Sequence, residues 1–114
     1  MIDDRGQRLA TLICKGADDI WDIRASGAEF YFDFNGKIFS LRRSDDGTFS
    51  LFAYPRWVAH INFLITNLEH GSDDPDATFA PIHAERDGTL SLLFKKLQER
   101  YLGLDNLYAE FGIE

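Results

Sequence analysis

Three histidines and one cysteine are the side chains of this sequence with the most reactive chemistry. His83 and Glu85 have the His-x-Glu spacing of zinc deaminases, in which the glutamate moves protons beside a metal-bound water. That chemistry also needs a Pro-Cys-x-x-Cys motif downstream, whereas Cys14 is the only cysteine and lies upstream. The sequence therefore does not predict a deaminase site.

The histidines are also poorly spaced for a metal site. None of His60, His70 and His83 has a second histidine four residues away, which is the spacing that places two ligands on one face of a helix. Surface or helix-capping positions are the expected places for these side chains. A single cysteine also excludes an internal disulfide framework and every metal site that needs several cysteines.

An acidic segment, residues 72–78, contains Asp73, Asp74 and Asp76 around one proline. These residues resemble the start of a calcium loop, but the central glycine and the glutamate that close such a loop are missing. A polar segment broken by proline is typical of a surface turn. We expect a mobile acidic loop here, and we predict no cofactor for the chain.

The known templates for nucleophilic catalysis are not met either. A catalytic Cys14 would need a nearby base and a lowered pKa, but it lies in an apolar helical stretch, so packing in the core is the expected role. The chain has no Gly-x-Ser-x-Gly elbow, no Gly-rich phosphate loop and no dinucleotide fingerprint. An enzyme stays an alternative only, as a small enzyme or ligand-binding protein with a pocket between sheet and helices that uses His60 or His83.

Composition and charge indicate a folded acidic protein. The 114 residues are 45% hydrophobic and 14% aromatic, which suits one domain, residues 1–114, with a real core. The net charge is −7, and the cations are scattered, so direct binding of nucleic acid is not expected. The chain starts without a basic segment followed by an apolar one, and no apolar run approaches the length of a membrane span. We therefore predict a cytoplasmic protein that does not bind membranes.

The stretch from Glu29 to Leu41 organises the expected fold. Asn35-Gly36 lies between two alternating apolar runs, and both residues tolerate the positive φ of a type I′ turn. A two-residue loop fixes the register, with Phe34 opposite Lys37 and Glu29 opposite Arg42. The turn and the side chains agree, because this register places unlike charges across the strands.

A second turn around Gly47 extends the hairpin into a meander with Leu51 opposite Leu41. Alternation then gives the meander one continuous apolar face, which the helices must cover. The residues of this face are Phe30, Phe32, Phe34, Phe39, Leu41, Phe49, Leu51 and Ala53.

The other elements follow from periodicity and from start and stop signals. Helices are expected from Asp3 or Asp4 to about Lys15 and over 90–102, with a further helical turn or two over 105–111. Short strands are expected over 18–24 and 79–85, the second at a sheet edge because of Pro81. Residues 55–68 fit a helix or a strand, and the helix is favoured. The predicted fold is α+β, an antiparallel β-meander of three to four strands with helices packed on one face.

The second face of the meander carries an apolar cluster where a solvated sheet would be polar. Its members are Tyr31, Ile38, Phe52 and Tyr54. Either another part of the chain covers this cluster or a second protein does. The leading prediction is a non-catalytic accessory domain that binds another protein through these four residues, with Asp73, Asp74 and Asp76 supplying charge.

The expected partner is another protein, for which a basic surface would suit the acidic chain, or a second copy in a homodimer formed through the same sheet face. The order of the expected elements is loosely similar to that of small acidic secretion chaperones and of some toxin-neutralising immunity proteins. No motif identifies either family, and the resemblance implies only an inhibitor-like, immunity-like or chaperone-like role.

Overall fold

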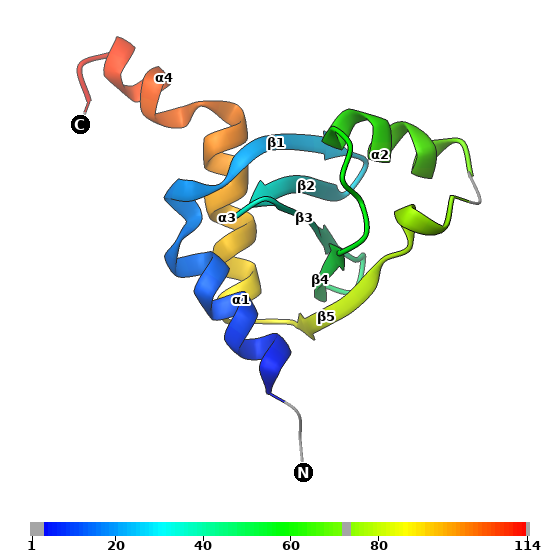
Figure 1. Cartoon of the computed structure of the whole chain (residues 1–114). Coiled ribbons are helices and arrows are strands. Elements are labelled where there is room, and N and C mark those ends of the chain that lie inside the picture. The colour runs from blue at the N-terminus through cyan, green and yellow to red at the C-terminus, as the bar shows by residue number, and fades with distance from the viewer. Residues whose placement is uncertain (1–3, 72–73, 114) are drawn as a thin grey trace.

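The hairpin around Asn35 and Gly36 lies at the centre of an α+β fold, and the other strands add to either side of it (Figure 1). The computed structural model describes residues 4–71 and 74–113. In chain order the elements are α1 (Arg5–Lys15), the short 3-10 helix η1 (Ala17–Asp19), β1 (Trp21–Ser26), β2 (Glu29–Phe34), β3 (Lys37–Arg43), β4 (Phe49–Tyr54), α2 (Ile61–Glu69), the 3-10 helix η2 (Pro75–Ala77), β5 (Ala80–Glu85), α3 (Thr89–Leu102) and α4 (Leu104–Glu110).

The predicted hairpin register is confirmed at every position. Phe34 pairs with Lys37 and Glu29 pairs with Arg42. Asn35 and Gly36 have φ values of 55° and 78°, as a type I′ turn requires. The Gly36 N–H also donates to the Asp33 carboxylate at 3.0 Å, which further fixes the turn.

The second turn is confirmed in the same way. Gly47 has a φ of 86°, and the Ser44 N–H donates to the Thr48 carbonyl at 2.8 Å across the loop. Leu41 pairs with Leu51, as the sequence predicts. β2, β3 and β4 therefore share one register, and their side chains alternate between two faces.

The sheet has five antiparallel strands in the order β1-β2-β3-β4-β5, rather than three to four. Both short segments whose strand character the sequence indicates join the sheet, and each becomes an edge strand. Each pairs irregularly: β1 shifts register between Trp21 and Arg24, where Asp22 has a φ of 50°, and β5 shifts opposite Leu51 and Phe52. Such bulges bend an edge strand and interrupt its ladder.

The first face of the sheet is covered by α1 and α3, which lie side by side (Figure 1). The two helices run in the same direction, because Gln7 at the start of α1 bonds Thr89 at the start of α3, and Lys96 reaches the Cys14 carbonyl further along. The core between these layers contains Ala10, Ile13, Cys14, Ala17, Ile20, Phe30, Phe32, Phe39, Leu41, Leu51, Leu90, Leu93 and Leu97. The predicted apolar face is thus the main core, and Cys14 is part of it.

α2 and η2 pack over part of the second face of the sheet. A second core cluster forms there from Tyr31, Ile38, Tyr54, Trp57, Ile61, Leu64 and Ala77. α1 and α3 cover the first face as predicted, and cover of the second face by another part of the chain is the one of the two stated alternatives that the structure confirms. Residues 55–68 do form a helix as favoured, but it begins only at Ile61, and Trp57 packs from the preceding loop.

The end of the chain departs from the body of the molecule. α3 ends at Gly103, which has a φ of 67°, and α4 follows at once and projects away from the sheet (Figure 1). No residue of α4 is buried. Tyr101, near the end of α3, is half exposed, although its ring lies 5.6 Å from that of Phe30.

Other expectations from the sequence are met in part. Asp4 stands at the start of α1, but its side chain makes no capping bond and pairs with Arg8 at 2.7 Å instead.

Residues 72–73 of the acidic segment lie outside the described residues, so the mobility of this segment stays a prediction. Within 4–71 and 74–113 no helix is both long and apolar enough to cross a membrane.

Gly6 sits where α1 approaches β5. A Cβ atom at this position would overlap the Ile82 carbonyl oxygen. The glycine that weakens the first turn of the helix is therefore the residue that allows the helix to approach the edge strand closely.

Replacing Gly6 with alanine is expected to destabilise the protein by about 1–3 kcal/mol, because the gain in helix propensity is smaller than the cost of forcing α1 away from β5. The free energy of unfolding from urea denaturation measures the effect. A neutral or stabilising Gly6→Ala substitution would show that α1 does not need this close approach.

Candidate functional site

An open depression with aromatic walls lies on the second face of the sheet, beside the part that α2 covers. Its volume is ≈ 150 Å³. We call it the aromatic depression, and it is lined by Glu29, Tyr31, Arg42, Phe52, Tyr54, Leu68 and Phe79.

Strand alternation explains which side chains reach this place. Tyr31, Arg42 and Phe52 come from three adjacent strands, and the register puts all three on the second face. α2 contributes Leu68 at its C-terminal end, and Phe79 enters just before β5 begins. The depression is the part of the second face that α2 leaves uncovered.

Phe79 meets two neighbouring aromatic rings edge to face. Phe79 lies 5.1 Å from Phe52 between ring centroids, with an interplanar angle of 79°, and 6.5 Å from Tyr54. Tyr31 and Tyr54 lie 6.0 Å apart. Edge-to-face pairs hold the rings in place, while Phe79 remains 52% exposed and presents its surface to the opening.

Two charged side chains border the depression. The Arg42 guanidinium lies 5.2 Å from the centroid of the Phe52 ring, a cation–π contact. Arg42 and Glu29 are paired in the β2–β3 register, but no ion pair joins Arg42 to a carboxylate among the described residues. The guanidinium therefore has donors available to a ligand.

Tyr54, which lines the depression, belongs to a buried hydroxyl pair. The Ser40 and Tyr54 hydroxyls lie 3.2 Å apart, and the Ser40 side chain is fully buried. Burial raises the pKa of Tyr54, and the bond to Ser40 offsets part of that rise. Burial also raises the pKa of Tyr31, with Tyr54 and Glu29 adding to it.

The four apolar residues predicted to bind a partner lie in two different places. Tyr31, Phe52 and Tyr54 come together in the aromatic depression. Ile38 is buried in the second core and does not line the depression. Of the two alternatives for covering the apolar cluster, cover by another part of the chain is confirmed for Tyr31, Ile38 and Tyr54, which are only 6%, 5% and 3% exposed.

The acidic residues proposed to supply charge have local roles where the structure describes them. The Asp74 side chain accepts from the Asp76 N–H at 2.9 Å and caps η2. Asp76 lies 3.6 Å from Arg56 in an exposed ion pair. Asp73 lies outside the described residues.

Sequence reasoning missed four lining residues. The sequence pattern indicates only cross-strand pairing for Glu29 and Arg42, although that register already places both on the second face. Phe79 precedes a predicted edge strand, and the sequence does not show that its ring turns back over Phe52. Whether Leu68 lines the depression depends on the course of the chain between β4 and α2, which no local sequence pattern indicates.

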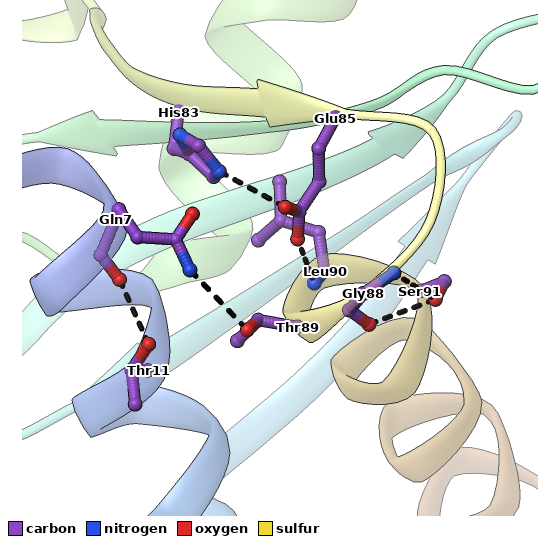
Figure 2. A network of polar contacts seen from close by, with 8 residues as sticks. All are labelled: Gln7, Thr11, His83, Glu85, Gly88, Thr89, Leu90 and Ser91. Carbon is purple, nitrogen blue, oxygen red and sulfur yellow. Dashed lines mark hydrogen bonds and ion pairs between the residues drawn. The ribbon is translucent and has the colours of Figure 1, made fainter. Parts of the chain in front are cut away.

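A second polar cluster joins β5 to the start of α3 (Figure 2). The His83 Nε2 lies 3.2 Å from one oxygen of Glu85, and the other oxygen accepts the Leu90 N–H at 2.6 Å. Ser91 closes the first turn of α3 by donating to the Gly88 carbonyl at 2.8 Å. Glu85 therefore acts as a helix cap supplied from the neighbouring strand.

This cluster gives His83 a carboxylate partner without completing a catalytic arrangement. The hydroxyl groups of Thr11, Thr89 and Ser91 in Figure 2 bond to Gln7 and Gly88, and no bond joins them to His83. Because the Glu85 carboxylate is occupied by the α3 backbone, a structural role accounts for the pair.

His60 also has a local role. Its Nδ1 accepts the Asn62 N–H at 3.1 Å at the start of α2, and its Nε2 lies 3.9 Å from Asp22. Among residues 4–71 and 74–113, no group of three or more His, Cys, Asp or Glu side chains is placed to hold a metal ion.

The chain matches no protein-family model, no curated protein and no solved structure. Its function is therefore argued from its own residues.

Replacing Glu85 with alanine is expected to destabilise the protein by about 1–2 kcal/mol, because the Leu90 N–H loses its acceptor at the start of α3. Asp87→Ala is the matched control, since this nearby carboxylate is exposed and should change stability by less than about 0.5 kcal/mol. Equal effects of the two substitutions on the unfolding free energy would contradict the capping role.

Stability is expected to fall as the pH rises above about 10. The pKa values of Tyr31 and Tyr54 are raised in the folded state, so the unfolded chain releases these protons first, and their contribution is complete only below the unfolded pKa. The slope should approach about 1.4 kcal/mol per pH unit for each phenol.

Urea denaturation across the alkaline range measures this decline. Tyr31→Phe should flatten it, whereas Tyr101→Phe, at a half-exposed ring, should leave it unchanged. Identical pH profiles for the two variants would show that the buried phenols do not cause the loss.

Proposed function

We propose that the chain is a non-catalytic accessory domain that binds a short segment of another protein at the aromatic depression. The observation that carries the proposal is an open, ring-walled depression bordered by a guanidinium without an ion pair in the described chain. An inhibitor, an immunity factor or a chaperone could act through such a site.

The size of the depression favours a single anchoring side chain. A volume of ≈ 150 Å³ is close to that of one medium-sized apolar residue. Aromatic side chains dominate the binding energy of protein interfaces when they surround a desolvated anchor. Phe52 and Phe79 are the walls that a ligand would reach first, because Tyr31 and Tyr54 are nearly covered.

The charged border favours a partner segment with polar groups beside its anchor. Arg42 offers donors to a carboxylate or a backbone carbonyl, and Glu29 offers an acceptor to a cation or an N–H. The proposed ligand is therefore an apolar side chain flanked by polar or charged groups. The net charge of −7 favours a partner that is basic overall, by steering the encounter.

The cysteine content of the chain favours a reducing compartment, such as the cytoplasm, as the place where the protein acts. The single cysteine is buried in the core and forms no disulfide. Direct binding to nucleic acid is not part of the proposal, because the chain is acidic overall and its cations are dispersed.

A library of random peptides displayed on phage provides a defined probe for this site. Selection should enrich peptides that share an apolar anchor, and Phe79→Ala should weaken binding of the synthesised peptide about 30-fold, which corresponds to about 2 kcal/mol. Arg42→Gln should weaken it less, because the guanidinium contributes at the exposed border. Fluorescence polarisation gives the dissociation constants.

Phe63→Ala is the matched control, since Phe63 is 64% exposed on α2 and does not line the depression. Its affinity for the peptide should equal that of the unmodified chain. No enrichment, or peptide binding that Phe79→Ala leaves unchanged in a folded protein, would refute the proposed site.

A further inference from the structure

Exposed large apolar side chains concentrate in two neighbouring places that the proposed function does not use. Of the twelve such side chains in the described chain, eight lie at the end of α1, the start of β1, the end of α3, or in α4 and the residues just after it. They are Leu12, Trp21, Tyr101, Leu102, Leu107, Tyr108, Phe111 and Ile113.

The first place is the apolar side of α4. Leu104, Leu107, Tyr108 and Phe111 follow the i, i+3, i+4, i+7 spacing that puts four side chains on one face of a helix. Phe111 is 74% exposed, and none of the four is buried. Asp105 and Glu110 fall on the opposite side. This is an amphipathic helix whose apolar side lacks a cover in the described chain.

The second place is a hollow of ≈ 510 Å³ beside η1, which we call the Trp21 hollow. It is lined by Leu12, Asp19, Trp21, Phe34, Asn35 and Gly36. Trp21 is 72% exposed and Leu12 is 59% exposed, so two large apolar side chains face solvent at its walls. Its volume is enough for several side chains of a helix.

The helix and the hollow belong to adjoining surfaces. Ala17 and Asp18 of η1 line a polar hollow together with Asp105 of α4, and the next residue, Asp19, lines the Trp21 hollow. Figure 1 shows α4 pointing away from the body of its own chain. A surface that offers both a protruding helix and a nearby receiving hollow can pair with itself across a two-fold axis.

We propose that the chain forms a two-fold homodimer in which the apolar side of α4 of each copy lies in the Trp21 hollow of the other copy. A stable interface buries about 800 Å² per partner. Trp21, Tyr108 and Phe111 are 72%, 48% and 74% exposed, so each can still bury roughly half to three quarters of the about 150–250 Å² that an aromatic side chain buries in full. Together the eight exposed side chains at this side offer apolar area on the order of what such an interface needs.

Charge at the same surface is compatible with this pairing. Lys96 and Arg100 donate to the backbone carbonyls of Cys14 and Ala17, at 3.0 and 2.6 Å, and form no ion pair with a described carboxylate. Both cations line the polar hollow, where Lys15 joins them and where Asp18, Glu99 and Asp105 balance the charge. The polar hollow is thus locally neutral, whereas the Trp21 hollow that receives α4 carries one carboxylate, Asp19, and no cation among its lining residues, so the pairing depends on apolar contact.

The proposal is independent of the aromatic depression, which shares no lining residue with the Trp21 hollow. Peptide binding at the depression and self-association through α4 can therefore fail separately.

Sedimentation velocity of the full chain over a dilution series tests the dimer. The expected mass is twice the 13.0 kDa of one chain. Phe111→Asp and Trp21→Asp should each raise the dimer dissociation constant more than about tenfold. Val58→Asp is the matched control, because Val58 is 93% exposed elsewhere and should leave the mass unchanged. A monomeric unmodified chain at every concentration would overturn the proposal.

Mixing the two variants distinguishes this arrangement from other dimers. In a dimer of Phe111→Asp chains both α4 helices are altered, and in a dimer of Trp21→Asp chains both hollows are altered. In a mixed dimer the unaltered α4 of the Trp21→Asp chain can still lie in the unaltered hollow of the Phe111→Asp chain. The mixture should therefore associate measurably more than either variant alone. A mixture that stays monomeric, with circular dichroism showing both variants folded, would refute the seating of α4 in the Trp21 hollow.

Discussion

The type I′ turn at Asn35-Gly36 is the constraint on which the rest of the structure depends. It fixes the β2–β3 register, and the next turn carries that register to β4. Since side chains alternate along a strand, a shift by one residue would exchange the contents of the two cores. The main core under α1 and α3, the smaller core under α2 and the aromatic depression all follow from this one register.

The sequence predicts the strands and the main core well because these features depend on local turn chemistry and on alternation. The predictions for α1, α3 and the central hairpin are confirmed because each carries its own stop signal or period. The number of strands predicted from the sequence is too low, since each edge strand pairs through a bulge. An irregular edge gives a weak local pattern, so its place in the sheet depends on tertiary contacts.

The candidate site was predictable only in part, for a related reason. Alternation places Tyr31, Phe52 and Tyr54 on one face, and they do meet in the depression. Whether a residue on that face is covered depends on where α2 lies, and its position is set by Trp57 and Ile61 packing on the sheet. No pattern within residues 55–68 encodes that contact. The sequence therefore identified the correct face but not which part of it stays open.

The irregular edge strands have a consequence for how copies of this chain can meet. A regular edge strand exposes a row of unpaired N–H and C=O groups that can recruit another strand without limit. Here β1 is bent at Asp22, and β5 carries Pro81, which has no N–H to offer. Both irregularities make the pairing of a further strand at these edges less favourable, so association between copies is expected to depend on side-chain contacts.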